Sequence, residues 1–155
     1  MPTLHFGFEE TSYSDKSLTA ADVAEILEDK YGVVEHFYEL HKNEIEELIT
    51  EAFASELNNS LQNNVSWNTT NAFWKGTNIE IMTATKSNPY AIAIDKIKEM
   101  FHRAIDQKEF DSLGIPGVPT KDSLKGKTPS TNKGPVRPSF LFSGIFKESF
   151  RVWIE

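Results

Sequence analysis

The chain contains one long run of residues whose apolar side chains recur at every third or fourth position, from about Glu35 to Asn58. This spacing predicts an amphipathic helix, because residues three and four apart share one face of a helix. The apolar face consists of Phe37, Leu40, Ile45, Leu48, Ile49, Ala52, Phe53 and Leu57. We expect the Asn-rich stretch 58–64 to fray this helix or to form a connection, since asparagine side chains compete for backbone hydrogen bonds.

Two further helices are expected, one on each side of this run. The first covers about residues 19–31, where Thr19 can cap the helix and Gly32 can end it. The second covers about residues 88–110, with a proline in its first turn, where proline is tolerated. The segment 67–85 has no clear periodicity and can supply short strands or loop anchors.

The two ends of the chain alternate apolar and other residues, which is the period of a half-buried strand. Residues 3–9 place three apolar side chains on one side, and residues 149–155 do the same: Leu4, Phe6 and Phe8; Phe150, Val152 and Ile154. With 11 phenylalanines, large aromatic side chains are expected to supply much of the core. We predict a single α+β domain over residues 1–155, in which a small mixed sheet of N- and C-terminal strands packs against two or three helices.

Residues 115–137 contain four of the seven prolines and show almost no periodicity, so we expect an extended arm or a flexible loop. A structureless stretch of this length suggests that something outside the subunit orders it. The segment is basic, whereas residues 22–56 are strongly acidic. The charges are interpreted either as solvated surfaces or as complementarity between neighbouring subunits. Non-specific binding of nucleic acid is disfavoured, because the net charge is −7.

The sequence contains no cysteine, which excludes disulfides and thiolate metal sites and fits a protein made in a reducing cytoplasm. Its first residues lack the basic and apolar segments of a secretory signal. No stretch approaches the ~20 apolar residues of a membrane-spanning helix. We therefore expect an intracellular protein with no membrane partner.

Few residues form a pattern typical of catalysis. Glu99 and His102 make a Glu-x-x-His, which is half of a carboxylate-bridged di-iron motif, but no second copy occurs. His41 and Glu44 lie one helical turn apart, as acidic helices often produce by chance. No nucleophile or phosphate-binding motif is present. We expect no enzymatic activity, no metal and no cofactor, with a metal-dependent enzyme using Glu99 and His102 as the competing hypothesis.

The C-terminal run 137–155 contains a basic-proline stretch, then Ser143-Gly144 followed by an apolar residue, then Ser149-Phe150-Arg151. This order resembles the ending of tailed-phage neck and tail-completion proteins, in which a proline precedes Thr-Gly-x-Leu and then Ser-Ile. Residues 21–41 also look similar to phage morphogenesis proteins. The resemblance implies a small α+β subunit, present in several copies in a ring, without catalytic activity.

On this resemblance the chain is expected to be a structural virion protein, made in the host bacterial cytoplasm. It would form a homo-oligomeric ring at the head–tail neck or tail terminus, beside other neck, connector or tail proteins, without sequence-specific nucleic acid. The alternatives are a baseplate or other tail component, or a morphogenesis factor absent from the virion. The predicted subunit interface comprises Lys121, Lys125, Lys127, Lys133, Arg137, Phe140, Phe142, Phe146, Phe150, Arg151 and Trp153. Trp153 can also be an ordinary core residue, and Arg151 a surface ion pair.

Overall fold

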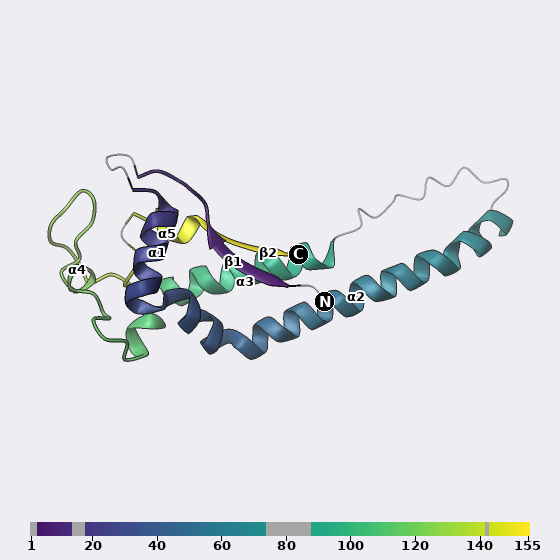
Figure 1. The fold of residues 1–155 in the computed structure, drawn as a ribbon, viewed down its shortest axis with the longest axis horizontal. Helices are drawn as coiled ribbons and strands as arrows, with labels where there is room; N and C mark the ends of the chain where they lie inside the picture. Colours follow the sequence, from purple (N-terminus) through teal and green to yellow (C-terminus); the bar gives the residue numbers. More distant parts are fainter. Residues whose placement is uncertain (1–2, 14–17, 74–87, 142) are drawn as a thin grey trace. The chain divides into compact units, whose positions relative to one another are not determined.

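The computed structural model describes residues 3–13, 18–73, 88–141 and 143–155 (Figure 1). Its elements are β1 (Leu4–Phe8), α1 (Ala20–Tyr31), α2 (Val33–Phe73), α3 (Pro89–Asp106), the 3-10 helix η1 (Phe110–Ser112), α4 (Lys121–Leu124), α5 (Ile145–Glu148) and β2 (Phe150–Ile154). The predicted α+β class is confirmed. The chain divides into two compact units: the sheet unit, Met1–Lys42 with Lys96–Glu155, and the helical unit, Asn43–Asp95.

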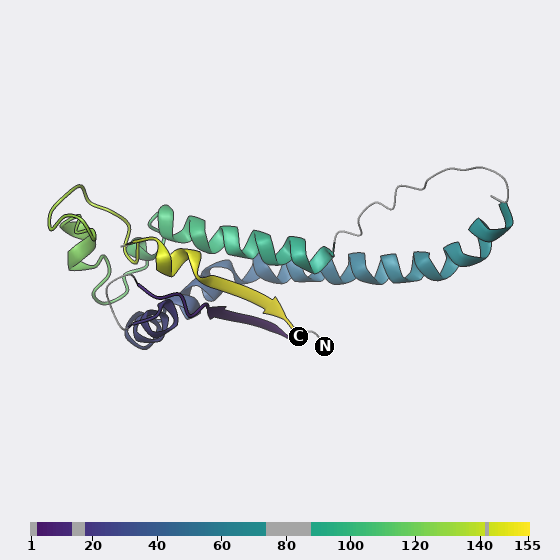
Figure 2. The ribbon, with the colours of Figure 1, turned by 90° about the horizontal axis from the view of Figure 1, so that it is seen from above.

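The sheet joins the two ends of the chain, as predicted. Strands β1 and β2 are antiparallel, and the register pairs Phe6 with Val152 and Phe8 with Phe150. Figure 2 shows the strands side by side, with α5 leading directly into β2. One face of the sheet therefore carries the alternating apolar residues, and the opposite face carries the residues between them.

Aromatic side chains fill the core of the sheet unit, which explains the high phenylalanine content. Phe37, Phe101 and Phe150 are fully buried, and they come from α2, α3 and β2. The rings of Phe101 and Phe150 stack with centroids 3.9 Å apart, and Phe37 meets Phe101 edge to face at 5.2 Å. Each such pair contributes about 0.5–1.5 kcal/mol beyond the burial of its area. With the contact of Phe6 on β1 with Phe37 at 6.3 Å, both strands thus pack by aromatic rings against the parts of α2 and α3 that belong to the sheet unit.

The junction between α1 and α2 is a single residue, Gly32. Its φ of 57° lies in the left-handed region, and its N–H donates to the carbonyl of Glu28 at 2.8 Å. The carboxylate of Glu28 then accepts hydrogen bonds from the N–H groups of Val34 and Glu35. One glutamate therefore caps the first turn of α2 while its own backbone ends α1. The predicted cap at Thr19 is also confirmed, because its side chain accepts from the backbone of Asp22.

Helix α2 is longer than predicted, since it continues through the Asn-rich stretch 58–64 to Phe73. The expectation of a break there is wrong. A residue of poor helix propensity costs only up to about 0.7 kcal/mol, whereas elongation of an existing helix adds one hydrogen bond per residue. Helix α3 begins at the predicted cap and ends at Asp106, earlier than predicted. The possible strand at 79–82 lies outside the described residues.

Candidate functional site: a closed cationic loop and the terminal sheet

The basic segment is a closed loop rather than an extended arm. We call residues 120–141 the cationic loop. The N–H of Gly134 donates to the carbonyl of Lys125 at 3.0 Å, and the N–H of Arg137 donates to that of Ser123 at 3.1 Å. Of the two predicted alternatives, the structure therefore contains a loop, ordered by contacts within the chain.

Two glycines make this closure possible. Gly126 has a φ of 63°, and a Cβ on it would lie 2.2 Å from the carbonyl oxygen of Pro135 and 2.3 Å from the carbonyl carbon of Gly134. The loop backbone therefore crosses itself at a point where no side chain fits. Sequence reasoning treated these glycines as signs of flexibility. Their place eight residues apart within the basic stretch is the pattern that could have indicated the crossing.

The guanidinium of Arg137 donates hydrogen bonds to backbone carbonyls of the loop. Its Nε donates to the carbonyl of Lys127 at 2.6 Å, and its guanidinium NH1 donates to the carbonyls of Pro138 and Leu141 at 3.1 and 2.7 Å. Partial burial lowers the pKa of Arg137 from its ordinary value, and the nearby charge of Asp122 acts in the opposite direction. Arg137 therefore donates three hydrogen bonds to the loop backbone, and its predicted interface role stays a prediction.

Buried hydroxyl groups fix the base of the loop. Ser123 and Ser139 are almost completely buried, and their Oγ atoms lie 3.3 Å apart. Ser123 Oγ donates to the carbonyl of Thr120, and Ser139 Oγ accepts from the N–H of Thr120. Next to them the ring of Phe140 packs against Tyr31. Sequence reasoning missed the two serines, because serine is common on surfaces and only the fold buries these two.

The outer surface of the loop combines positive charge with apolar groups. Lys121, Lys125 and Lys133 are exposed, and none of them pairs with a carboxylate among the described residues. Leu124 is 52% exposed and Val136 57% exposed. In contrast, Lys127 lies 3.9 Å from Asp122. The loop therefore presents a cationic surface with large apolar side chains within it.

The outer face of the sheet carries a stacked pair of rings. Trp153 stacks on His5 with centroids 5.3 Å apart and an angle of 10° between the rings. A Cβ on Gly7 would lie 2.9 Å from the Trp153 ring, so the indole also covers this glycine. Trp153 remains 41% exposed. It is therefore not a core residue, and its free surface is available to a partner.

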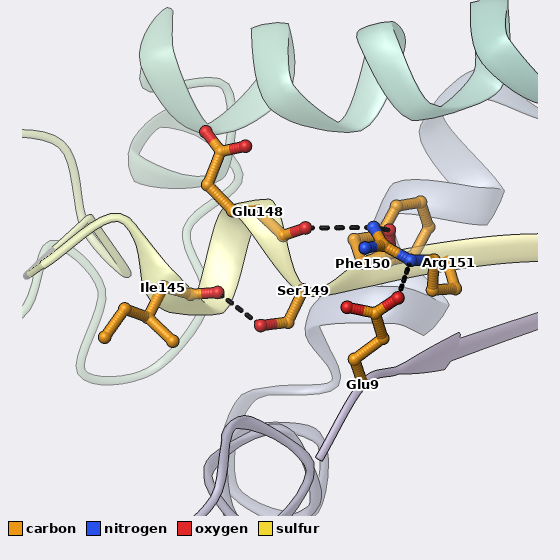
Figure 3. A network of polar contacts seen from close by, with 6 residues as sticks. All are labelled: Glu9, Ile145, Glu148, Ser149, Phe150 and Arg151. Atoms are coloured by element: carbon orange, nitrogen blue, oxygen red, sulfur yellow. Dashed lines mark hydrogen bonds and ion pairs between the residues drawn. The ribbon is translucent and has the colours of Figure 1, made fainter. Parts of the chain in front are cut away.

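Arg151 ties the corner between α5 and β2 together (Figure 3). Its guanidinium forms an ion pair with Glu9 and donates to the carbonyls of Glu148 and Phe150. In the same corner, Ser149 Oγ donates to the carbonyl of Ile145 at 2.6 Å. The interpretation of Arg151 as a surface ion pair is confirmed.

Comparison with known proteins found no matching family model, no similar curated protein and no similar solved structure. Function must therefore be inferred from the chain's own residues.

Among the predicted interface residues, the aromatic ones differ in position. Phe140, Phe146 and Phe150 are buried within the single chain, so their side chains cannot form a subunit surface. Phe142 lies outside the described residues. The exposed members are Lys121, Lys125, Lys133 and Trp153.

The histidines and acidic residues form no recognisable metal centre. In the part of the chain that the structure describes, no three His, Asp or Glu side chains are grouped so that they could hold a metal ion. Glu99 is exposed, while Nε2 of His102 is buried without a hydrogen-bond partner. His41 Nε2 lies 2.8 Å from a carboxylate oxygen of Glu109, which joins α2 to the turn after α3.

Among the described residues, no helix combines the length and the hydropathy that crossing a lipid bilayer requires.

Proposed function

We propose that this chain is a structural subunit of a tailed-bacteriophage particle that assembles into a homo-oligomeric ring at the head–tail neck or tail terminus. Two kinds of observation support the proposal. The first is the resemblance of residues 137–155 to the ending of neck and tail-completion proteins. The second is the terminal sheet, whose geometry suits association between copies. The proposed role is mechanical, and no side chain is assigned a catalytic function.

The sheet offers backbone hydrogen-bonding groups at both of its edges. Thr3 and Glu155 exchange two hydrogen bonds, of 2.7 and 3.0 Å. Because such pairs alternate along an antiparallel ladder, the backbone groups of alternate residues point away from the partner strand. On β1 these residues are Leu4, Phe6 and Phe8, and on β2 they are Phe150, Val152 and Ile154.

The sheet has only two strands among the described residues, so neither edge is paired with a third strand. A neighbouring copy can therefore add a strand to either edge. If β1 of one copy pairs with β2 of the next, the contact is head-to-tail, and a head-to-tail contact with the right rotation closes into a ring. The free edges of this sheet are the observation that carries the proposal.

The edge can be tested by removing one outward N–H group. Ile154 lies near the end of β2, where its N–H points to the open edge. Ile154→Pro removes that donor, whereas Ile154→Ala shortens the side chain and keeps it. We expect Ile154→Pro to prevent ring formation in light scattering and electron microscopy, while Ile154→Ala still assembles. Rings of unchanged size from Ile154→Pro would contradict the use of this edge.

Mass spectrometry of purified particles tests the virion assignment separately. A structural ring subunit is expected in a fixed stoichiometry with the other neck and tail proteins. Absence from particles, together with presence in infected cells, would instead indicate a morphogenesis factor. Location at the far end of the tail in an electron cryomicroscopy map would favour a baseplate component.

A further inference from the structure

We propose that the cationic loop of one copy docks on an exposed acidic and apolar face of helix α2 in a neighbouring copy. The inference rests on the ring-forming role proposed above and names a second contact that would build the ring. Each copy would use two different surfaces, one on the sheet unit and one on the helical unit. The contact is between chains and requires no particular placement of the two units within one chain.

The receiving surface is a row of residues that we call the α2 stripe, composed of Glu46, Thr50, Phe53, Leu57 and Leu61. Successive members are three or four residues apart, so they lie one above another on the same side of the helix. Phe53 and Leu57 are each 51% exposed, and Leu61 is 58% exposed. Three large apolar side chains in one exposed row are more than scattered surface residues, and such rows mark contact surfaces.

From Asn43 onward the charge around the α2 stripe is negative, while Lys42, one turn before Glu46, lies over the ring of Tyr38. Helix α2 contains no lysine or arginine from Asn43 to Phe73, but it contains five glutamates: Glu44, Glu46, Glu47, Glu51 and Glu56. Glu46 lies in the stripe, and Glu56 lies about 60° around the helix from Phe53 at 3.6 residues per turn. Neither Glu46 nor Glu56 pairs with a cation among the described residues. The stripe is therefore an apolar surface edged by unpaired negative charge.

The cationic loop has the complementary composition. Lys121 and Leu124 lie on α4, and Lys125 is its C-cap. Leu124 and Lys125 follow Lys121 by three and four residues, so all three share the side opposite the buried Ser123. Val136 adds a second exposed apolar side chain. The loop is already closed by internal hydrogen bonds, so little conformational entropy is lost when its surface docks.

A second copy fits this surface better than a nucleic acid does. Both surfaces carry exposed apolar side chains, and Leu124 and Val136 would gain little from a phosphate backbone. The net charge of −7 also opposes binding to a polyanion. Because the loop and the stripe are different surfaces, a contact that no two-fold axis reciprocates leaves one loop and one stripe free at the ends, and repetition of that contact builds a ring rather than an isolated pair.

The test exchanges charges between the two surfaces. The loop-reversed variant is Lys121→Glu/Lys125→Glu, and the helix-reversed variant is Glu46→Lys/Glu56→Lys. Each variant alone is expected to self-associate roughly tenfold more weakly or worse in analytical ultracentrifugation, the effect of replacing exposed attractive pairs with repulsive ones. The defect should decrease in high salt, because ions screen exposed charges.

Restored assembly in two situations would support the contact between copies. A chain with all four changes has an acidic loop and a basic helix, so it should again associate with itself. An equimolar mixture of the two variants should also associate, because each loop then meets an opposite charge on the other variant's helix. As matched controls, Lys96→Glu and Glu25→Lys change exposed charges outside both surfaces and should leave assembly unchanged. Circular dichroism melts verify that every variant folds.

Other outcomes would overturn the inference. If the parent chain forms rings and both reversed variants form them equally well, the loop–helix contact is wrong while the ring role stands. If the parent stays monomeric at all concentrations, both proposals fail. If the parent chain binds a labelled oligonucleotide through these lysines, and the loop-reversed variant assembles as the parent does, the loop is a phosphate-binding surface instead.

Discussion

Substitution of Gly126 by alanine tests whether the cationic loop is closed as described. The added Cβ would lie 2.2 Å from the carbonyl oxygen of Pro135 and 2.3 Å from the backbone of Gly134. Both neighbours are backbone, so no side chain can rotate away. The loop must then open at this crossing, and its hydrogen bond between Gly134 and Lys125 is lost.

The expected cost combines two effects. A non-glycine residue in the left-handed region costs about 1 kcal/mol or more, and Gly126 has a φ of 63°. Each hydrogen bond lost on opening adds about 0.5–1.5 kcal/mol, and the N–H of Arg137 bonding to Ser123 is the second one at risk. Local closure of the loop should therefore weaken by roughly 2–4 kcal/mol.

Gly114→Ala is a matched control, because Gly114 has a φ of 71° and no atom within 4 Å of the position of its Cβ. Gly114→Ala should lower stability only by the backbone strain of the left-handed conformation, about 1 kcal/mol. We expect Gly126→Ala to increase amide hydrogen exchange and trypsin cleavage at Lys125 and Lys127, while the aromatic core stays folded. Equal protection of the loop in the two alanine variants would refute the crossing.

Three further substitutions test separate features of the sheet unit. Arg137→Lys keeps the charge but removes the planar set of donors, so the loop should lose about 1–3 kcal/mol of local stability by hydrogen exchange. Asp22→Asn tests the α1 cap, because hydrogen bonds from Thr19 lower the pKa of the Asp22 carboxyl in the folded state. The ionised carboxylate therefore stabilises the fold fully above the unfolded-state pKa of Asp22, and this stabilisation is lost as the pH falls through the folded-state pKa. That acid-induced loss should be smaller in the variant's melts. Gly7→Ala, made in a chain with Trp67→Phe and Trp74→Phe so that Trp153 is the sole tryptophan, should displace the Trp153 ring and shift its fluorescence to longer wavelength, and an unchanged spectrum would contradict the stacking.

Local patterns in the sequence were sufficient to predict the two strands, the starts of α1, α2 and α3 and the α+β class, whereas η1 and α4 were not predicted. Alternation at both ends of the chain indicated β1 and β2, and the cap at Thr19 indicated the start of α1. These features depend on residues close together in the chain. The end of α2 was missed, because local propensity did not determine how far the helix continues through 58–64.

The candidate site was predicted less well, because its key contacts join residues that are separated in sequence. The loop was expected to need a neighbouring subunit for order. Instead, the glycine crossing at Gly126 and the Arg137 hydrogen bonds close it within one chain. Likewise, an apolar C-terminal run suggested a surface for partners, but the stack of Phe150 on Phe101 places part of that run in the core. Periodicity indicates which side chains are buried and does not distinguish burial within a chain from burial between chains.

Folding of the loop and docking of its charges can be separated by comparing variants. Charge reversal at Lys121 and Lys125 changes the exposed surface and leaves the hydrogen bonds that close the loop in place. Gly126→Ala keeps every charge and disrupts the closure. If docking needs a preformed surface, Gly126→Ala should weaken ring assembly although its charges are unchanged, and high salt should not alter that defect. If Gly126→Ala instead assembles as the parent does, the charges act from an open loop and the closed conformation is not required for the contact.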